Sequence, residues 1–299
     1  MQKQMKPNNL SGVWTALVTP FSRNRVDHGR MSELVALAAE AKLTGIVPLG
    51  STGESAALTE NERESVISNT VKASDGKLRV MVGAGSNNTS KTIDNIQQAG
   101  DLGADAALVV VPYYNKPTPE GLKRHFLSVA EVSSLPIVLY HIPSRCGVGI
   151  PPDLVIELAE HPRIIGIKEA GGDVHRSGEI ARLTKGKFAV LSGDDPLTLP
   201  LMAIGSVGAI SVISNLAPKK TRRMIDLCLL DEFNQARRIH RELSPLLNAI
   251  SLETNPAPIK EAMNQTGMKV GRVRPPLAPV RHETRRAIRQ AITDLGKIE

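Results

Sequence analysis

Short apolar runs alternate with helical patterns along the chain from residue 12 to residue 230. Most runs are about four to nine residues long, which is the length expected of a buried strand. They lie at residues 12–20, 45–50, 78–82, 106–111, 136–140, 163–168, 187–191 and 208–213. Between them, apolar residues recur at helical spacing, for example over residues 31–43. The pattern therefore predicts about eight strand–helix units.

Capping residues indicate where several helices begin. Thr59, followed three positions later by Glu62, has the sequence of a capping box. Thr118 precedes a proline, which is favoured at the first position of a helix because its missing N–H would have no helical partner there. Asp195 also precedes a proline and is predicted to be the N-cap of a later helix.

The alternation of strands and helices predicts a parallel sheet covered by helices. Strands that are apolar along their whole length are buried on both faces, as in α/β folds. About eight units in about 220 residues fit a closed barrel better than an open sheet. A dinucleotide-binding sheet would carry Gly-x-Gly-x-x-Gly after its first strand, and this strand ends in Thr19-Pro20 instead. We expect an α/β fold, with a (β/α)8 TIM barrel over residues 1–230 and a C-terminal helical subdomain over 231–299.

Composition excludes several classes of protein. The chain has 299 residues, of which 41% are hydrophobic and 22% charged, as in an ordinary globular protein. Residues 1–10 contain no apolar core, so we expect no signal peptide, and no apolar run approaches the length of a membrane span. Cys146 and Cys228 are too few for a disulfide framework or a thiolate metal site. We expect a cytoplasmic protein with no membrane contact and no metal.

The formal net charge is +7, and much of the excess lies after residue 218. Nucleic-acid-binding proteins combine such charge with aromatic or groove-reading elements, but only 3% of this chain is aromatic. The basic residues are interspersed with Asp and Glu on helical patterns, which indicates solvated helix surface. We expect no nucleic-acid partner, while a positive field would favour anionic carboxylate substrates.

The run at residues 163–168 ends in Lys168, just before a glycine-rich turn. A lysine at the end of a buried strand is partly desolvated, which disfavours the ammonium form and leaves some neutral amine at pH 7. A neutral amine attacks a ketone carbonyl to form a Schiff base. The structural alternative is a lysine that extends its charge to the surface.

Other polar residues follow the predicted strands, at the end where TIM barrels carry their active sites. All three tyrosines are there: Tyr113 and Tyr114 follow the fourth strand, and Tyr140 closes the fifth. A tyrosine beside a lysine imine can relay protons, although a packed tyrosine with its hydroxyl in water is the structural alternative. These positions strengthen the interpretation of Lys168 as a nucleophile.

Two further features suit a carboxylate ligand. The turn at Ser51 and Thr52 offers hydroxyls and backbone amides, unless it serves only to connect strand and helix. Arg145 carries a planar fork suited to bidentate carboxylate binding, unless it is a surface residue. We expect Cys146 to be a packed residue, because nothing nearby in the sequence is its obvious base. We expect His141 to be structural, and the alternative is that it tunes the site.

Several segments resemble the pyruvate-dependent class I aldolases, and within them the dihydrodipicolinate synthase family. The matching segments are residues 12–21, 50–54, 112–117, 140–145, 167–170, 192–195 and 255–260. The resemblance covers nearly the whole chain and implies a (β/α)8 barrel with a lysine imine and no other cofactor. It implies condensation of pyruvate with L-aspartate 4-semialdehyde to 4-hydroxy-tetrahydrodipicolinate, in lysine and diaminopimelate biosynthesis.

The resemblance also implies roles for individual residues. Lys168 would form the imine, and the proton-relay positions would be Ser51, Tyr140 and Tyr114, the last reaching in from a neighbouring subunit. Ser51 and Thr52 would hold the pyruvate carboxylate, and a buried Arg145 the carboxylate of aspartate semialdehyde. The main chain of Gly193 and Ile210 would line the pocket. The implied assembly is a homotetramer built from two tight dimers.

Some positions depart from the family pattern. His141, Cys146 and Gly171 stand where asparagine, threonine, and serine or threonine are common. Glu60, Arg63 and Lys91 replace the His, His and Glu of lysine-inhibited members. Because a lysine there would repel the ammonium group of the effector, the sequence argues against tight lysine inhibition.

Two other functions stay open. One is a related Schiff-base aldolase or dehydratase that acts on a 2-oxo sugar acid or a hydroxyproline derivative, and Arg145 disfavours it. The other is a non-catalytic protein that binds 2-oxo acids, which would not need Lys168, Tyr140 and Ser51 together.

Overall fold

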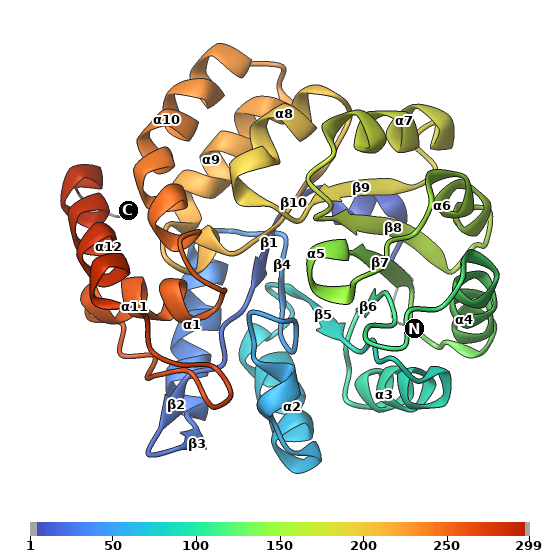
Figure 1. Ribbon diagram of the computed structural model, residues 1–299, viewed down its shortest axis with the longest axis horizontal. Helices are drawn as coiled ribbons and strands as arrows, with labels where there is room; N and C mark the ends of the chain where they lie inside the picture. The colour runs from blue at the N-terminus through green and yellow to red at the C-terminus, as the bar shows by residue number, and fades with distance from the viewer. Residues whose placement is uncertain (1–4, 297–299) are drawn as a thin grey trace.

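Eight parallel strands form a closed barrel inside a ring of helices (Figure 1). The computed structural model describes residues 5–296. The barrel strands are β1 (Gly12–Ala16), β4 (Gly45–Val47), β5 (Arg79–Gly83), β6 (Ala106–Val110), β7 (Ile137–His141), β8 (Ile164–Glu169), β9 (Ala189–Ser192) and β10 (Gly208–Ser211). Each pairs with the next, and β10 closes the barrel on β1. The predicted fold class is confirmed.

The helices that cover the barrel follow the strands in order. They are α1 (His28–Glu40), α2 (Glu60–Ser74), α3 (Thr89–Asp101), α4 (Pro119–Val132), α6 (Pro152–Ala159), α7 (Val174–Thr184), α8 (Thr198–Ala203) and α9 (Pro218–Leu229). The sequence pattern missed a short hairpin, β2 (Phe21–Ser22) with β3 (Arg25–Val26), and the one-turn helix α5 (Pro143–Cys146). These elements are too short to show a periodicity.

Two of the predicted caps are present. The Thr59 hydroxyl accepts from the Glu62 amide, and the Glu62 carboxylate accepts from the Thr59 amide, which completes the capping box of α2. The Thr118 hydroxyl accepts from the Gly121 amide at the start of α4. Such a cap contributes on the order of 1 kcal/mol by satisfying an amide that would otherwise lack a partner.

The predicted N-cap at Asp195 is wrong. Asp195 begins the 3-10 helix η3 (Asp195–Leu197), and its carboxylate accepts from the amides of Val212 and Ile213, each at 2.8 Å. These two amides follow β10, so the carboxylate joins neighbouring strand ends. A sequence pattern shows only nearby partners, whereas this bond spans 17 positions.

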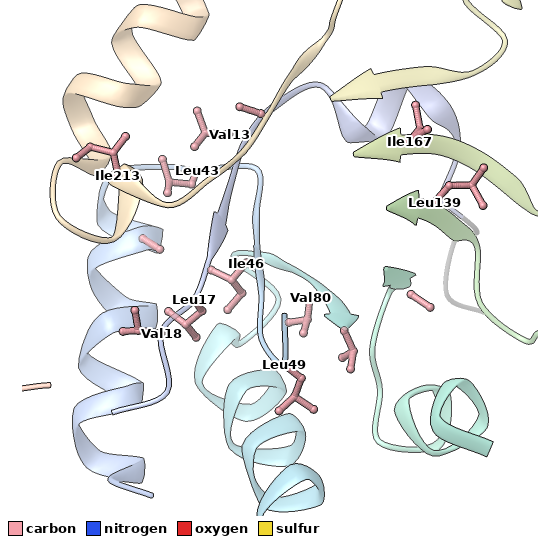
Figure 2. Close-up of a cluster of buried hydrophobic side chains, with 14 of the residues drawn as sticks. Val13, Leu17, Val18, Leu43, Ile46, Leu49, Val80, Leu139, Ile167 and Ile213 are labelled. Carbon is pink, nitrogen blue, oxygen red and sulfur yellow. The ribbon is translucent and has the colours of Figure 1, made fainter. Parts of the chain in front are cut away.

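Hydrophobic side chains form two layers on either side of the strands. The outer layer lies between the strands and the helices and includes Leu139 of β7 and Ile167 of β8 (Figure 2). The inner layer fills the barrel and includes Trp14, Met81 and Leu191. Successive residues of a strand point to opposite faces, so one strand supplies both layers.

The amino-terminal end of the barrel is closed by the 3-10 helix η1 (Pro7–Leu10). Leu10 is fully buried, and its carbonyl accepts from the Trp14 indole N–H at 2.9 Å. Gly166 makes room for it, since a Cβ there would lie 2.9 Å from Leu10 Cδ1. The 3-10 helix η1 therefore fills the amino-terminal end of the barrel with apolar side chains.

Three helices follow α9 and lie on one side of the barrel, where α10 packs against α9 (Figure 1). They are α10 (Phe233–Ile250), α11 (Ala257–Gln265) and α12 (His282–Leu295). No strand follows β10 within residues 5–296. The division of the chain at residue 230 stays a prediction, because α10 packs directly against α9.

Candidate active site

A cavity of about 530 Å³ lies at the carboxyl ends of the strands. Its walls come from loops that follow β4, β5, β6 and β7, and from the segment before α11. The polar residues that line it include Ser51, Tyr113, Tyr140, Arg145 and Asn255. The structure therefore brings together residues that lie far apart in the sequence, at the place that the fold predicts.

Lys168 and Tyr140 are partners across neighbouring strands. The Lys168 Nζ lies 4.3 Å from the centroid of the Tyr140 ring, which in turn lines the cavity. The two residues are only 4% and 6% exposed. Within residues 5–296, the Lys168 ammonium has no hydrogen-bond partner. A buried amine without a partner is suited to nucleophilic attack, since no bond must be broken first.

Asp195 and Gly193 lie around the same lysine. Burial raises the pKa of the Asp195 carboxyl, and the positive charge of Lys168 is among the influences that oppose this rise. The Gly193 amide donates to the Glu169 carbonyl at 2.7 Å. A Cβ at Gly193 would lie 2.9 Å from Lys168 Cε, so only glycine lets this backbone approach the lysine side chain.

Asn255, which precedes α11, connects two of the predicted substrate-binding residues. Its side-chain amide donates to the Thr52 hydroxyl at 2.9 Å. Its main-chain carbonyl accepts from Arg145 Nη2 at 2.8 Å. Thr52 is 2% exposed, whereas Arg145 is exposed in the single chain. The expectation that Arg145 is buried is therefore wrong for one chain alone.

The remaining predicted residues take different positions. Ser51 is half-buried and lines the cavity, and Ile210 is 1% exposed inside the barrel, in register with Trp14. Tyr114 is 89% exposed and is not among the residues that line the cavity, which is lined by Tyr113 instead. One chain therefore does not bring Tyr114 to Lys168, and its contribution from a neighbouring subunit stays a prediction.

Cys146 and His141 are buried, as expected of structural residues. Cys146 is 3% exposed, and burial raises the pKa of its thiol to about 11, which leaves little thiolate for nucleophilic attack. His141 is 6% exposed, and burial lowers the pKa of its imidazole to about 4. The histidine is therefore neutral at pH 7.

The outer end of the cavity carries the three residues that depart from the lysine-inhibited pattern. Lys91 Nζ lies 3.0 Å from Glu60 Oε1, and Arg63 Nε lies 3.9 Å from Glu60 Oε2. Burial lowers the pKa of Arg63. Two cations thus share one carboxylate here, and weak inhibition by lysine stays a prediction.

Sequence reasoning missed several residues that hold this site together. Asn255 and Lys260 stood within a segment that resembles the family, but nothing in that segment indicated their partners. Lys260 forms a buried ion pair with Glu54 at 2.7 Å, and these residues lie 206 positions apart. Only the folded chain brings such pairs together.

Among residues 5–296, no group of three or more His, Cys, Asp and Glu side chains is arranged to hold a metal ion. In the same part of the chain, no helix is long and apolar enough to cross a membrane.

The closed barrel with a cavity at its strand ends is the architecture of the TIM-barrel enzymes. The model of the Dihydrodipicolinate synthetase family matches residues 9–295. A protein of Methanothrix thermoacetophila named 4-hydroxy-tetrahydrodipicolinate synthase is 43% identical over 289 residues, covering 96% of this chain and 97% of the relative. The chain therefore belongs to the dihydrodipicolinate synthetase family, and the predicted resemblance is confirmed.

Solved structures agree with this assignment. The crystal structure of dihydrodipicolinate synthase from Thermotoga maritima is similar, with a TM-score of 0.94, 40% identity and coverage of 96% of this chain and 98% of that one. A structure described as a monomeric dihydrodipicolinate synthase variant has a TM-score of 0.94 at 38% identity, covering 97% and 98% of the two chains. Membership of the family therefore leaves the number of subunits open.

Proposed function

We propose that this chain is a lyase that condenses pyruvate with L-aspartate 4-semialdehyde to 4-hydroxy-tetrahydrodipicolinate, a step of lysine and diaminopimelate biosynthesis. The observation that carries the proposal is the buried Lys168, which contacts Tyr140 and has no hydrogen-bond partner within residues 5–296. The family supports the same reaction, because relatives about 40% identical over nearly the full chain bear this name.

The reaction proceeds through a covalent imine and requires no other cofactor. The Lys168 amine adds to the pyruvate ketone, and the carbinolamine loses water to give the imine. Loss of a methyl proton gives an enamine, whose carbon attacks the aldehyde and forms the new carbon–carbon bond. The amine of the semialdehyde then attacks the imine carbon, which closes the ring and releases Lys168. Tyr140, Ser51 and Tyr114 relay the protons.

The two substrate carboxylates bind at different places. Ser51 and Thr52 hold the pyruvate carboxylate, while the main chains of Gly193 and Ile210 contact the bound substrate. Arg145 binds the carboxylate of the semialdehyde. One N–H of its Nη2 donates to the Asn255 main-chain carbonyl, and the other N–H groups of the guanidinium are left for this carboxylate.

The assembly and the compartment are also proposals. We propose a homotetramer of two tight dimers in the cytoplasm. The 89% exposure of Tyr114 supports a role in a neighbouring subunit, because an exposed side chain is free to enter another chain's cavity. Sedimentation velocity tests the assembly, and a fully active monomer would contradict it.

Reductive trapping combined with a condensation assay tests the function. Intact mass after treatment with pyruvate and borohydride should show a pyruvyl adduct, and the aldehyde should be consumed only when both substrates are present. Arg145→Ala should raise the KM for the semialdehyde about 10- to 100-fold, because it removes a charge-assisted pair. Adduct formation by this variant should equal that of the wild type, and Arg145→Lys, which keeps the charge without the fork, is the matched control.

Two results would favour the alternatives. An adduct with no condensation, but with cleavage of a 2-oxo sugar acid, would favour the related aldolase. Absence of any adduct on the folded protein would favour a binding protein for 2-oxo acids.

A further inference from the structure

A second pair of side chains lies directly outside the Tyr140–Lys168 pair. β7 and β8 run in register, with Tyr140 opposite Lys168 and His141 opposite Glu169. Because successive side chains point to opposite faces, the second pair lies outside the barrel wall. His141 and Glu169 are 6% and 2% exposed, and Nε2 lies 3.5 Å from Oε1. The proposed reaction uses neither residue.

The His141 ring occupies a slot between two glycines. A Cβ at Gly149 would lie 2.4 Å from the ring carbon Cε1, and a Cβ at Gly171 would lie 2.7 Å from Nε2. Neither glycine has a positive φ, so neither is needed for an unusual backbone conformation. Space for the imidazole is the physical reason for glycine at both positions.

Hydrogen bonds assign the proton of this neutral imidazole. The Ile150 amide donates to Nδ1 at 3.1 Å, so Nδ1 carries no proton and Nε2 directs its N–H toward Glu169. The Glu169 carboxylate, 3.5 Å from Nε2, accepts from the Gly171 amide and from Arg176 Nε, both at 3.0 Å. The ring therefore connects the loop after β7 to the loop after β8.

The bond between His141 and Ile150 closes the loop that carries Arg145. The two residues are nine positions apart, and Ile150 is 1% exposed at the far end of the loop. The one-turn helix α5 and Arg145 lie between them. Closing a loop at its base reduces the conformations open to its middle, and hence to the Arg145 side chain.

We propose that His141 is a positioning residue that sets Arg145 in place for the carboxylate of the second substrate. It acts by closing the loop from the slot between Gly149 and Gly171, and it does not touch the substrate. The inference rests on the proposed function, because it assigns the effect to semialdehyde binding and leaves imine formation unaffected.

Two substitutions separate the hydrogen bond of the ring to Ile150 from its contact with Glu169. The amide of His141→Asn reaches the position of Nδ1 and can still accept from Ile150, whereas that of His141→Gln reaches the position of Nε2 and Glu169. His141→Gln should raise the KM for aspartate semialdehyde about tenfold, since small displacements of a positioning group have effects of this order. His141→Asn should stay within about twofold of the wild type. The KM for pyruvate and the trapped adduct should change in neither.

A double-mutant cycle tests the slot itself. Gly149→Ala should raise the same KM about tenfold, because its Cβ displaces the ring. Combining it with His141→Asn should reverse most of this increase in KM, because the smaller asparagine side chain leaves the space of the ring carbon Cε1 empty. Additive effects would overturn the inference, as would a lower Tm for His141→Gln with both KM values unchanged. A wild type that does not condense the two substrates would instead refute the proposed function.

Discussion

Two lysines are buried within residues 5–296, and they differ in their hydrogen-bond partners. Lys260 of α11 is 1% exposed, and its ammonium donates to the Glu54 carboxylate at 2.7 Å and to the carbonyls of Thr19 and Arg272. Lys168 is 4% exposed and contacts the face of Tyr140, without a hydrogen-bond partner in residues 5–296. Burial alone therefore does not distinguish a nucleophile from a structural lysine.

The two lysines differ in the groups that accept hydrogen bonds from the side-chain nitrogen. Three acceptors hold the Lys260 ammonium, so it joins the C-terminal helices to the loop after β4 and has no free electron pair. The Lys168 nitrogen instead lies against the face of the Tyr140 ring, where no acceptor has to be displaced before it attacks a ketone. A protein can retain such a residue at a cost in stability when function requires it.

Replacing Lys168 should give the largest effect. Lys168→Ala should lower condensation by about 10³-fold or more, because the imine cannot form. Its Tm should be unchanged or higher, since the substitution removes a buried group without partners. Steady-state assays, borohydride trapping and thermal unfolding measure the three quantities. A large fall in Tm would show that Lys168, like Lys260, has a structural role.

The ion pair at Lys260 should show the opposite behaviour. Glu54→Ala should lower the free energy of unfolding by about 3–5 kcal/mol, because it leaves a buried ammonium without its carboxylate. Urea denaturation measures this change, and the folded variant should still give the pyruvyl adduct. The double variant with Lys260→Met should recover part of the loss. A stability equal to that of the wild type would contradict the comparison.

A smaller effect should appear at low pH in the same region. Arg274, whose main-chain amide donates to Glu54, hydrogen-bonds through its side chain to Glu62 and lowers the pKa of that carboxyl from 4.5 to about 2. A lowered folded-state pKa adds stability above about pH 4.5 that is lost as the pH falls toward 2. Glu62→Gln should therefore flatten the pH dependence of stability in this window by about 1–2 kcal/mol.

Thermal unfolding from pH 5 to pH 2 measures this dependence. Arg274→Gln should remove the same slope, because it removes the other partner of the pair. Persistence of the wild-type slope in both variants would assign the pH dependence to other carboxylates.

Much of the fold could be predicted because its signals are local. The apolar run at residues 163–168 and the strand β8 differ by about one residue at each end. The caps of α2 and α4 were found because each cap and its partner lie within one helical turn. Asp195 had the same sequence signal, but its carboxylate reaches Val212 and Ile213 after β10, and no local pattern shows this.

In the candidate site too, some residues could be predicted from the sequence and their distant partners could not. Lys168 and Tyr140 could be predicted as site residues, because barrel enzymes carry their catalytic groups at the ends of the strands. The register of β7 and β8 places the two residues opposite each other. The partners of Arg145 and Thr52 could not be predicted, because Asn255 lies 110 and 203 positions away from them. The exposure of Tyr114 likewise depends on how a loop folds in three dimensions.

By itself, the sequence determined the order of the strands and helices and the residue types available at each strand end. Periodicity and capping act over a few residues and can be read along the chain. Only the tertiary structure decided which of two buried lysines is held by acceptors and which is left without them. That outcome depends on contacts such as Lys260 with Glu54, 206 positions away, which exist only once the barrel has closed and the C-terminal helices have packed on it.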